Sequence, residues 1–258
     1  MVHDQIVNRF MKFIGIIPAR YASTRFPGKP LAEICGKTVI RRVYEQARKA
    51  LDTVVVATDD ERIYNDVESF GGKVVMTRPD HKCGTDRCLE AYQAITTPAW
   101  REQNDKDTVI INIQGDEPFI QPEQIEALMA CFDRPDTDIA TLVQPFAEDK
   151  NAIENPNSPK VNWDVETQEA KMFSRKVIAA SDSKYYKHIG IYAYRADVLS
   201  KITTLPQSPL EIAERLEQLR WLENGYKIRV GVTSQSTIGI DTPEDLEKAI
   251  EWYKYNGN

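Results

Sequence analysis

Short apolar runs alternate with amphipathic segments along most of the chain. The runs have the length of buried strands, and the amphipathic segments repeat with the period of helices. The runs predict strands at 13–17, 53–58, 73–77, 107–113, 138–143, 188–194 and 228–232. Helices are predicted at 36–51, 60–70, 87–95, 122–132 and 210–222, with a final helix starting behind Thr242 and Pro243. This alternation predicts an α/β fold with a doubly wound, mainly parallel sheet. Functional loops should then follow the carboxyl ends of its strands.

The alternation changes near residue 148. Segments 160–164 and 170–173 have the pattern of a hairpin rather than of a strand–helix unit. We expect 148–195 to form a smaller inserted α+β subdomain that carries substrate or dimer contacts, within a single domain spanning 11–258. Residues 1–10 are expected to be a disordered N-terminal extension, because a strand begins directly behind Met11 and Lys12.

Composition narrows the class of protein. The chain has 258 residues, 33 of them basic and 39 acidic, and its net charge of −6 argues against nucleic-acid or membrane-surface binding. No apolar run approaches the roughly 20 residues of a membrane helix. The four cysteines form no Cys-x-x-Cys pair and are too few for a disulfide framework. Reduced thiols in a cytoplasmic protein are the simplest interpretation.

The loop behind the first strand has the features of a phosphate site. It carries two hydroxyls and three fixed positive charges: Arg20, Ser23, Thr24, Arg25 and Lys29. Such groups beyond the carboxyl end of a strand suit a bound polyphosphate. The loop is not a Walker loop, because it lacks the Gly-x-x-x-x-Gly-Lys-Ser/Thr pattern. The alternative is a solvated basic loop with no ligand.

Two carboxylates should lie near that loop. Asp116 follows the strand at 107–113, and Asp241 follows the apolar residues 238–240. Hard carboxylate oxygens beside a triphosphate are what a magnesium site requires, with phosphate oxygens and water completing the coordination. Each could instead be an ordinary turn or strand-end residue.

Other catalytic machinery is missing from the sequence. The chain has three histidines and shows no Ser/His/Asp order, no zinc pattern and no Gly-x-Gly-x-x-Gly motif. A dehydrogenase therefore lacks its dinucleotide-binding signature. Metal-assisted transfer at phosphorus needs alignment and charge neutralisation rather than a protein nucleophile, which agrees with the residues present.

A series of ordered motifs adds a family resemblance. They are Ile17-Pro-Ala-Arg-Tyr-Ala-Ser-Thr-Arg-Phe-Pro-Gly-Lys-Pro-Leu31, Val56-Ala-Thr-Asp59, Met76-Thr-Arg78, Gly84-Thr-Asp-Arg87, Asn112-Ile-Gln-Gly-Asp-Glu-Pro118, Phe173-Ser-Arg175, His188-Ile-Gly-Ile-Tyr192, Leu216-Glu-Gln-Leu-Arg220 and Asp241-Thr-Pro-Glu-Asp-Leu246. In this order the series resembles the 3-deoxy-manno-octulosonate cytidylyltransferases, from Met11 almost to the end of the chain. The resemblance implies a Rossmann-like nucleotidyltransferase fold and a homodimer. It also implies an Mg²⁺-dependent transfer of CMP from CTP to the anomeric hydroxyl of the sugar acid, for lipopolysaccharide biosynthesis.

The same resemblance assigns roles to residues. Arg20, Lys29, Asp116 and Asp241 are implied to be catalytic, and the two aspartates to hold the metal. Nucleotide contacts are implied for Ala19, Arg20, Ser23, Thr24, Arg25, Lys29, Thr58, Asp59, Arg78, Gly84, Thr85 and Gln114. Sugar-acid contacts are implied for Arg175, His188, Tyr192, Glu217 and Gln218.

The chain departs from the family pattern at two places. Cys83 stands where the family commonly has Ser, and only residues 176–187 separate the Phe-Ser-Arg and His-Ile-Gly motifs, with Ala179 replacing a proline. The open alternatives are another acceptor, such as sialic acid or an 8-amino analogue, and a nucleotide-binding protein without catalysis.

Overall fold

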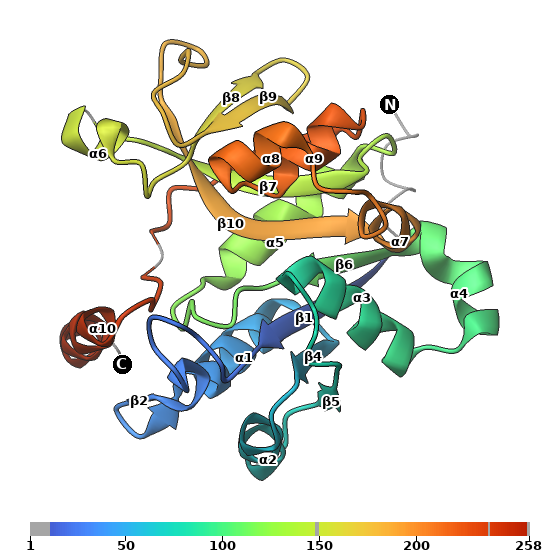
Figure 1. The fold of residues 1–258 in the computed structure, drawn as a ribbon, viewed down its shortest axis with the longest axis vertical. Helices are drawn as coiled ribbons and strands as arrows, with labels where there is room; N and C mark the ends of the chain where they lie inside the picture. The colour runs from blue at the N-terminus through green and yellow to red at the C-terminus, as the bar shows by residue number, and fades with distance from the viewer. Residues whose placement is uncertain (1–10, 148–149, 237, 257–258) are drawn as a thin grey trace.

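A single large sheet organises the molecule (Figure 1). The structure is a computed structural model that describes residues 11–147, 150–236 and 238–256. The expected N-terminal extension, 1–10, and the start of the block at 148 lie outside these residues. The strands are β1 (Lys12–Ala19), β2 (Glu33–Ile34), β3 (Lys37–Thr38), β4 (Val54–Thr58), β5 (Val74–Met76), β6 (Thr108–Asn112), β7 (Ile139–Pro145), β8 (Lys160–Asp164), β9 (Glu169–Ser174), β10 (Tyr186–Arg195) and β11 (Ile228–Val232).

Helices connect most of the strands. The α-helices are α1 (Val39–Ala50), α2 (Glu61–Ser69), α3 (Gly84–Ile95), α4 (Pro98–Asn104), α5 (Pro122–Ala130), α6 (Lys150–Glu154), α7 (Ala196–Ile202), α8 (Pro209–Glu214), α9 (Gln218–Glu223) and α10 (Pro243–Asn256). Short 3-10 helices are η2 (Lys29–Leu31), η3 (Asp105–Asp107) and η4 (Cys131–Asp133). The sequence pattern did not indicate α4, α6 or α7. None of the helices in the described part of the chain is long and apolar enough to cross a membrane.

The predicted mainly parallel sheet is parallel in only one half. Among the described residues it runs β5-β4-β1-β6-β10-β7-β11-β9-β8, and β5, β4, β1 and β6 are parallel neighbours. β10, however, is antiparallel to both β6 and β7. The sheet is therefore mixed rather than mainly parallel. The reason is that β10 follows a hairpin instead of a crossover helix, and an apolar run carries no information about strand direction.

The second half of the sheet closes on itself. β8 pairs with β10 at Lys160 and Lys187, so β10, β7, β11, β9 and β8 form a closed ring. The predicted hairpin is β8–β9, which forms one wall of this barrel. β10 belongs both to the barrel and to the centre of the large sheet, and it therefore joins the expected 148–195 block to the parallel half.

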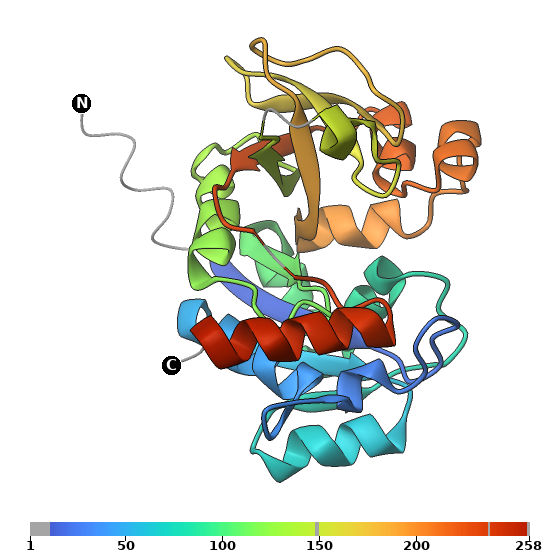
Figure 2. The same cartoon turned by 90° about the vertical axis from the view of Figure 1, so that its left-hand side faces the viewer.

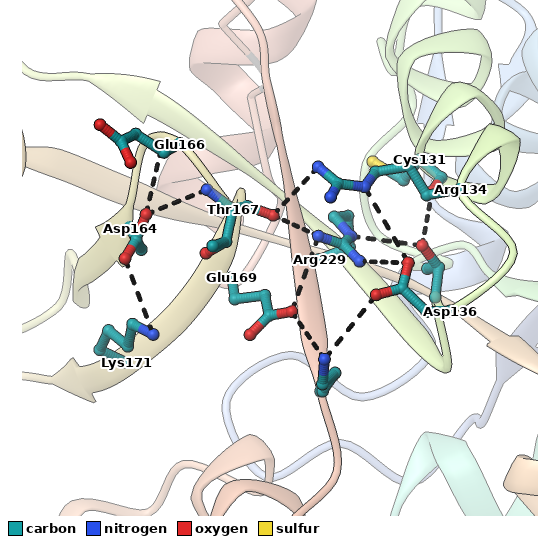
Figure 3. Close-up of polar contacts among 11 residues, drawn as sticks. Cys131, Arg134, Asp136, Asp164, Glu166, Thr167, Glu169, Lys171 and Arg229 are labelled. Carbon is teal, nitrogen blue, oxygen red and sulfur yellow. Dashed lines mark hydrogen bonds and ion pairs between the residues drawn. The ribbon is translucent and has the colours of Figure 1, made fainter.

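A buried arginine connects two strands of the barrel that share little backbone pairing. β11 and β9 share a single pairing, between Arg229 and Glu169. The Arg229 side chain is only 1% exposed, and its guanidinium lies 2.9 Å from Asp136 and 3.8 Å from Glu169 (Figure 3). It also donates to the carbonyl oxygen of Thr167 in the β8–β9 turn. Arg229 thus ties three segments together where few backbone hydrogen bonds connect them.

Helices cover both faces of the sheet, as a doubly wound fold requires. Residues of α1, α2 and α5 pack with one face, and residues of α3, α7 and α9 pack with the other. α10 lies apart from both clusters, across the front of Figure 2, and packs on Phe119 and on β2. This packing brings the segment before α10, which includes Asp241, to the carboxyl ends of β1 and β6.

The predicted helix at 210–222 is wrong. The structure has α8 and α9 instead, separated by Arg215 in the left-handed conformation with φ 54°. Each half is held to a different element: Glu214 accepts the backbone N–H of Arg175, while Glu217 faces α3. These tertiary contacts interrupt a segment whose local pattern is continuously helical.

Candidate active site

A cavity of about 290 Å³ opens at the carboxyl ends of β1 and β6. The wall beside β1 is the basic loop, and the opposite wall is the loop that leads into α3. Ten of the predicted site residues line it: Ala19, Arg20, Ser23, Thr24, Arg25, Lys29, Gly84, Gln114, Asp116 and Asp241. The topology therefore brings segments that are far apart in sequence to one edge, as expected for an open α/β sheet.

Two glycines allow the walls to come close. Gly28 has φ 74°, which a left-handed turn needs, and its N–H donates to the carbonyl oxygen of Tyr21. A Cβ on Gly115 would lie 2.8 Å from the carbonyl oxygen of Pro18, a backbone atom that a side chain would displace. The second glycine thus lets the segment after β6 press against the end of β1.

One lysine joins the two predicted metal ligands. The Nζ of Lys29 lies 2.5 Å from Asp116 Oδ2 and 3.3 Å from Asp241 Oδ1, and it also donates to the carbonyl oxygen of Ile240 at 2.9 Å. Arg25 approaches the same Asp241 oxygen at 2.8 Å. The backbone N–H of Ile240 donates to the carbonyl oxygen of Asp116, which fixes the two segments to each other. The two carboxylates therefore both contact the Lys29 ammonium group.

The donor set at this position suits Mg²⁺ only in combination with a ligand. Asp116 and Asp241 supply hard oxygen atoms, as Mg²⁺ prefers. The described residues contain no cluster of three or more His, Cys, Asp or Glu side chains that could hold a metal. Mg²⁺ commonly takes one or two carboxylates together with phosphates and water, so two aspartates beside a phosphate-binding loop meet that requirement.

The wall beside α3 includes residues that the sequence did not single out. His81, Lys82 and Arg87 line the cavity together with Cys83, the N-cap of α3. The His81 ring bonds to Glu90, which also accepts the backbone N–H of Arg78 and so holds the loop in place. The available signal was position in the sequence: His81 and Lys82 lie between two of the motifs, and Arg87 ends the motif that begins at Gly84.

Four of the expected nucleotide residues do not line the cavity: Thr58, Asp59, Arg78 and Thr85. Asp59 instead pairs with Arg87 at 2.9 Å. Arg78 is largely exposed and lies 3.4 Å from Glu90. Asp59 therefore contacts the cavity only through Arg87, and Thr85 donates to Glu217 instead.

The expected sugar-acid residues lie on β10, α9 and the end of β9. His188 is buried, with Nε2 2.9 Å from Thr141 Oγ1, and its ring packs between Phe173 and Tyr192. Burial lowers the pKa of His188 to about 3. The side chain of Arg175 is hydrogen-bonded to the backbone, because its Nε donates to the carbonyl oxygen of Glu214.

Glu217 and Gln218 connect this region to α3. Glu217 accepts hydrogen bonds from Thr85 Oγ1 at 2.9 Å and from Arg220 Nη2 at 2.8 Å, and burial raises its pKa. Gln218 Nε2 and Asn112 Oδ1 are buried and have no hydrogen-bond partner among the described residues. Buried polar atoms usually have partners, so this region has capacity for the hydroxyls of a ligand or for water.

Comparisons with known proteins identify the family of this chain. The cytidylyltransferase family matches residues 14–228. A 3-deoxy-manno-octulosonate cytidylyltransferase of Parabacteroides distasonis is 60% identical, with 93% of this chain and 97% of the relative covered. The protein of the same name from Bacteroides thetaiotaomicron is 58% identical, with 95% and 99% covered.

A solved structure is similar to the chain over nearly its whole length. The structure of CMP:2-keto-3-deoxy-manno-octonic acid synthetase complexed with CTP superposes with a TM-score of 0.85 at 40% identity, covering 95% of this chain and 99% of the other. The chain therefore belongs to the cytidylyltransferase family, and within it to the 3-deoxy-manno-octulosonate cytidylyltransferases.

Proposed function

We propose that this protein transfers CMP from CTP to the anomeric hydroxyl of 3-deoxy-manno-octulosonate and releases pyrophosphate. The observation that carries the proposal is the position shared by Lys29, Asp116 and Asp241 at the mouth of a cavity lined by a basic loop. A solved relative of the same family carries CTP. Phosphoryl transfer needs groups that align the nucleotide and neutralise its charge, and this constellation provides both.

We propose that Asp116 and Asp241 hold Mg²⁺ together with oxygen atoms of the nucleotide. A bound Mg²⁺ supplies charge neutralisation at the phosphates and lowers the pKa of a coordinated hydroxyl. The Lys29 ammonium provides positive charge beside the two carboxylates. Binding of the nucleotide would give Lys29 phosphate oxygens as further partners.

The remaining site residues receive roles from their position. Arg20, Ser23, Thr24 and Arg25 face the cavity from the loop after β1 and would contact the triphosphate, with Lys29 stabilising the leaving pyrophosphate. The N-terminus of α3 at Gly84 offers backbone N–H groups and the positive end of a helix dipole to the same ligand. Arg175, His188, Tyr192, Glu217 and Gln218 would contact the acceptor.

The test is a pyrophosphate-release assay with CTP and Mg²⁺. Release should depend on both CTP and 3-deoxy-manno-octulosonate, should be absent with sialic acid, and should stop when a chelator removes the metal. Competition with the 8-amino analogue identifies the preferred acceptor. CTP binding without release on any sugar acid would instead support a nucleotide-binding protein without catalysis.

We also propose a cytoplasmic homodimer. The four cysteines are free thiols, which accords with a reducing compartment. The dimer rests on the family resemblance, and light scattering of the purified protein measures its mass directly: a monomeric mass at working concentration would refute it.

A further inference from the structure

The first turn of α3 lies between the cavity and the expected acceptor region. Cys83 lines the cavity, and its Sγ donates a hydrogen bond to Glu217 Oε1 at 3.2 Å. Two residues further along, Thr85 Oγ1 donates to the other oxygen, Oε2, at 2.9 Å. Both oxygens of one carboxylate are therefore held by the turn that forms a wall of the nucleotide cavity.

The thiol has the protonation state that this contact needs. Burial raises the pKa of Cys83, and the negative charge of Glu217 raises it further. The thiol consequently keeps its proton and acts as a donor. On the other side, Arg220 Nη2 holds Glu217 at 2.8 Å, and Arg220 itself is fixed by Glu211 at 3.3 Å and by the carbonyl oxygen of Leu205. The Glu217 carboxylate is thus held by Arg220 on one side and by two donors at the start of α3, Cys83 and Thr85, on the other.

A second observation places the acceptor region against the same turn. The side-chain Nδ2 and Oδ1 atoms of Asn112 lie 3.7 and 3.8 Å from where a Cβ on Gly84 would be. Asn112 Oδ1 and Gln218 Nε2 are both buried without a partner among the described residues. The unsatisfied Asn112 Oδ1 therefore lies beside Gly84, which also lines the nucleotide cavity.

We propose that Cys83 and Thr85 are positioning residues that couple nucleotide binding to binding of the sugar acid through the Glu217 carboxylate. The inference rests on the proposed function, because it takes the two ligands from it. A phosphate bound at the N–H of Gly84 fixes the first turn of α3, the turn fixes the two donors, and the donors orient Glu217 for the acceptor. Coupling between two binding sites is reciprocal, so the sugar acid must strengthen nucleotide binding by the same factor.

Calorimetric titration measures this coupling directly. The nucleotide probe is α,β-methylene-CTP with Mg²⁺, because its α–β bridge does not release pyrophosphate. Its dissociation constant is measured with and without saturating 3-deoxy-manno-octulosonate. We expect tighter binding by about fivefold or more in the unaltered protein, within the usual range for coupled sites.

Substitutions then separate coupling from stability. The coupling factor is the ratio of the nucleotide dissociation constants without and with the sugar acid. Cys83→Ala combined with Thr85→Val should reduce this factor to about one, whereas Cys83→Ser, which keeps a hydrogen-bond donor, should retain it. Cys83→Ala alone is the milder variant and should lower the factor part of the way. Cys35→Ser is the matched control, because Cys35 is exposed and does not line the cavity. Melting temperatures check that each variant is folded.

The outcomes distinguish the two proposals. If the unaltered protein binds neither ligand, the proposed function fails and the coupling fails with it. Suppose instead that the unaltered protein binds both ligands, and that the folded Cys83→Ala and Cys83→Ala/Thr85→Val variants both keep the full coupling factor. The proposed function then stands, and only the coupling is overturned. A factor of about one in the unaltered protein also overturns it.

Discussion

Replacing Asp116 by Asn should impair catalysis more than the same change at Asp241. Both carboxylates approach the Lys29 ammonium, but Asp116 is closer, at 2.5 Å against 3.3 Å. The side chain of Asp116 is also less exposed, 29% against 47%, so its charge is less screened by water. The substitution keeps the size of the side chain and removes its charge.

The expected magnitudes follow from this difference. Loss of a preorganised electrostatic contact in an active site lowers turnover by about 100- to 1,000-fold, and we expect Asp116→Asn in that range. Asp241→Asn removes a half-exposed charge, and we expect about a fivefold loss, which corresponds to the ~1 kcal/mol of an exposed charge interaction. Turnover is measured as pyrophosphate release at saturating CTP and sugar acid while Mg²⁺ is varied.

The control is Asp197→Asn, because Asp197 pairs with Lys201 on α7 and does not line the cavity. Turnover of Asp116→Asn equal to that of the control would refute the role of Asp116. A larger loss at Asp241 than at Asp116 would refute the argument from distance and burial. Urea unfolding of all three variants shows whether any loss arises from instability.

Three further predictions concern stability and the shape of the cavity. Arg229→Met should lower the free energy of unfolding, measured in urea, by about 2 to 4 kcal/mol, because the buried guanidinium is lost while its half-exposed partner Asp136 keeps Lys227 nearby. The control is Arg134→Met, which changes an exposed arginine and should have little effect. Equal effects of the two substitutions would contradict the role of Arg229. The free energy of unfolding should fall as the pH drops from about 6.5 toward 3. In this range His188 is protonated in the unfolded chain but not in the folded protein, where its pKa is lowered to about 3. The contribution is up to about 1.4 kcal/mol per pH unit, and an unchanged slope in a His188→Asn variant would refute it. Gly115→Ala should weaken CTP binding by about tenfold or more, because its Cβ would lie 2.8 Å from the carbonyl oxygen of Pro18; calorimetry with unchanged affinity would show that the loop adapts.

The sequence was sufficient to predict the parallel half of the fold and one wall of the cavity. β1, β4 and β6 are continuous apolar runs, largely buried, of the kind that a sheet covered on both faces buries. Since polar residues follow the carboxyl ends of parallel strands, the loop with Arg20 and Lys29 could be placed beside Asp116 without coordinates. These features depend on local pattern, and local pattern is present in the sequence.

Only the tertiary structure decided the rest. The direction of β10 depends on which neighbours remain unpaired once the hairpin has formed, and the left-handed Arg215 depends on Glu214 and Glu217 having partners on different elements. The contacts of Cys83 and Thr85 with Glu217 join residues that are 134 and 132 positions apart in the chain. No period or propensity encodes such pairs, because they exist only when separate elements pack together.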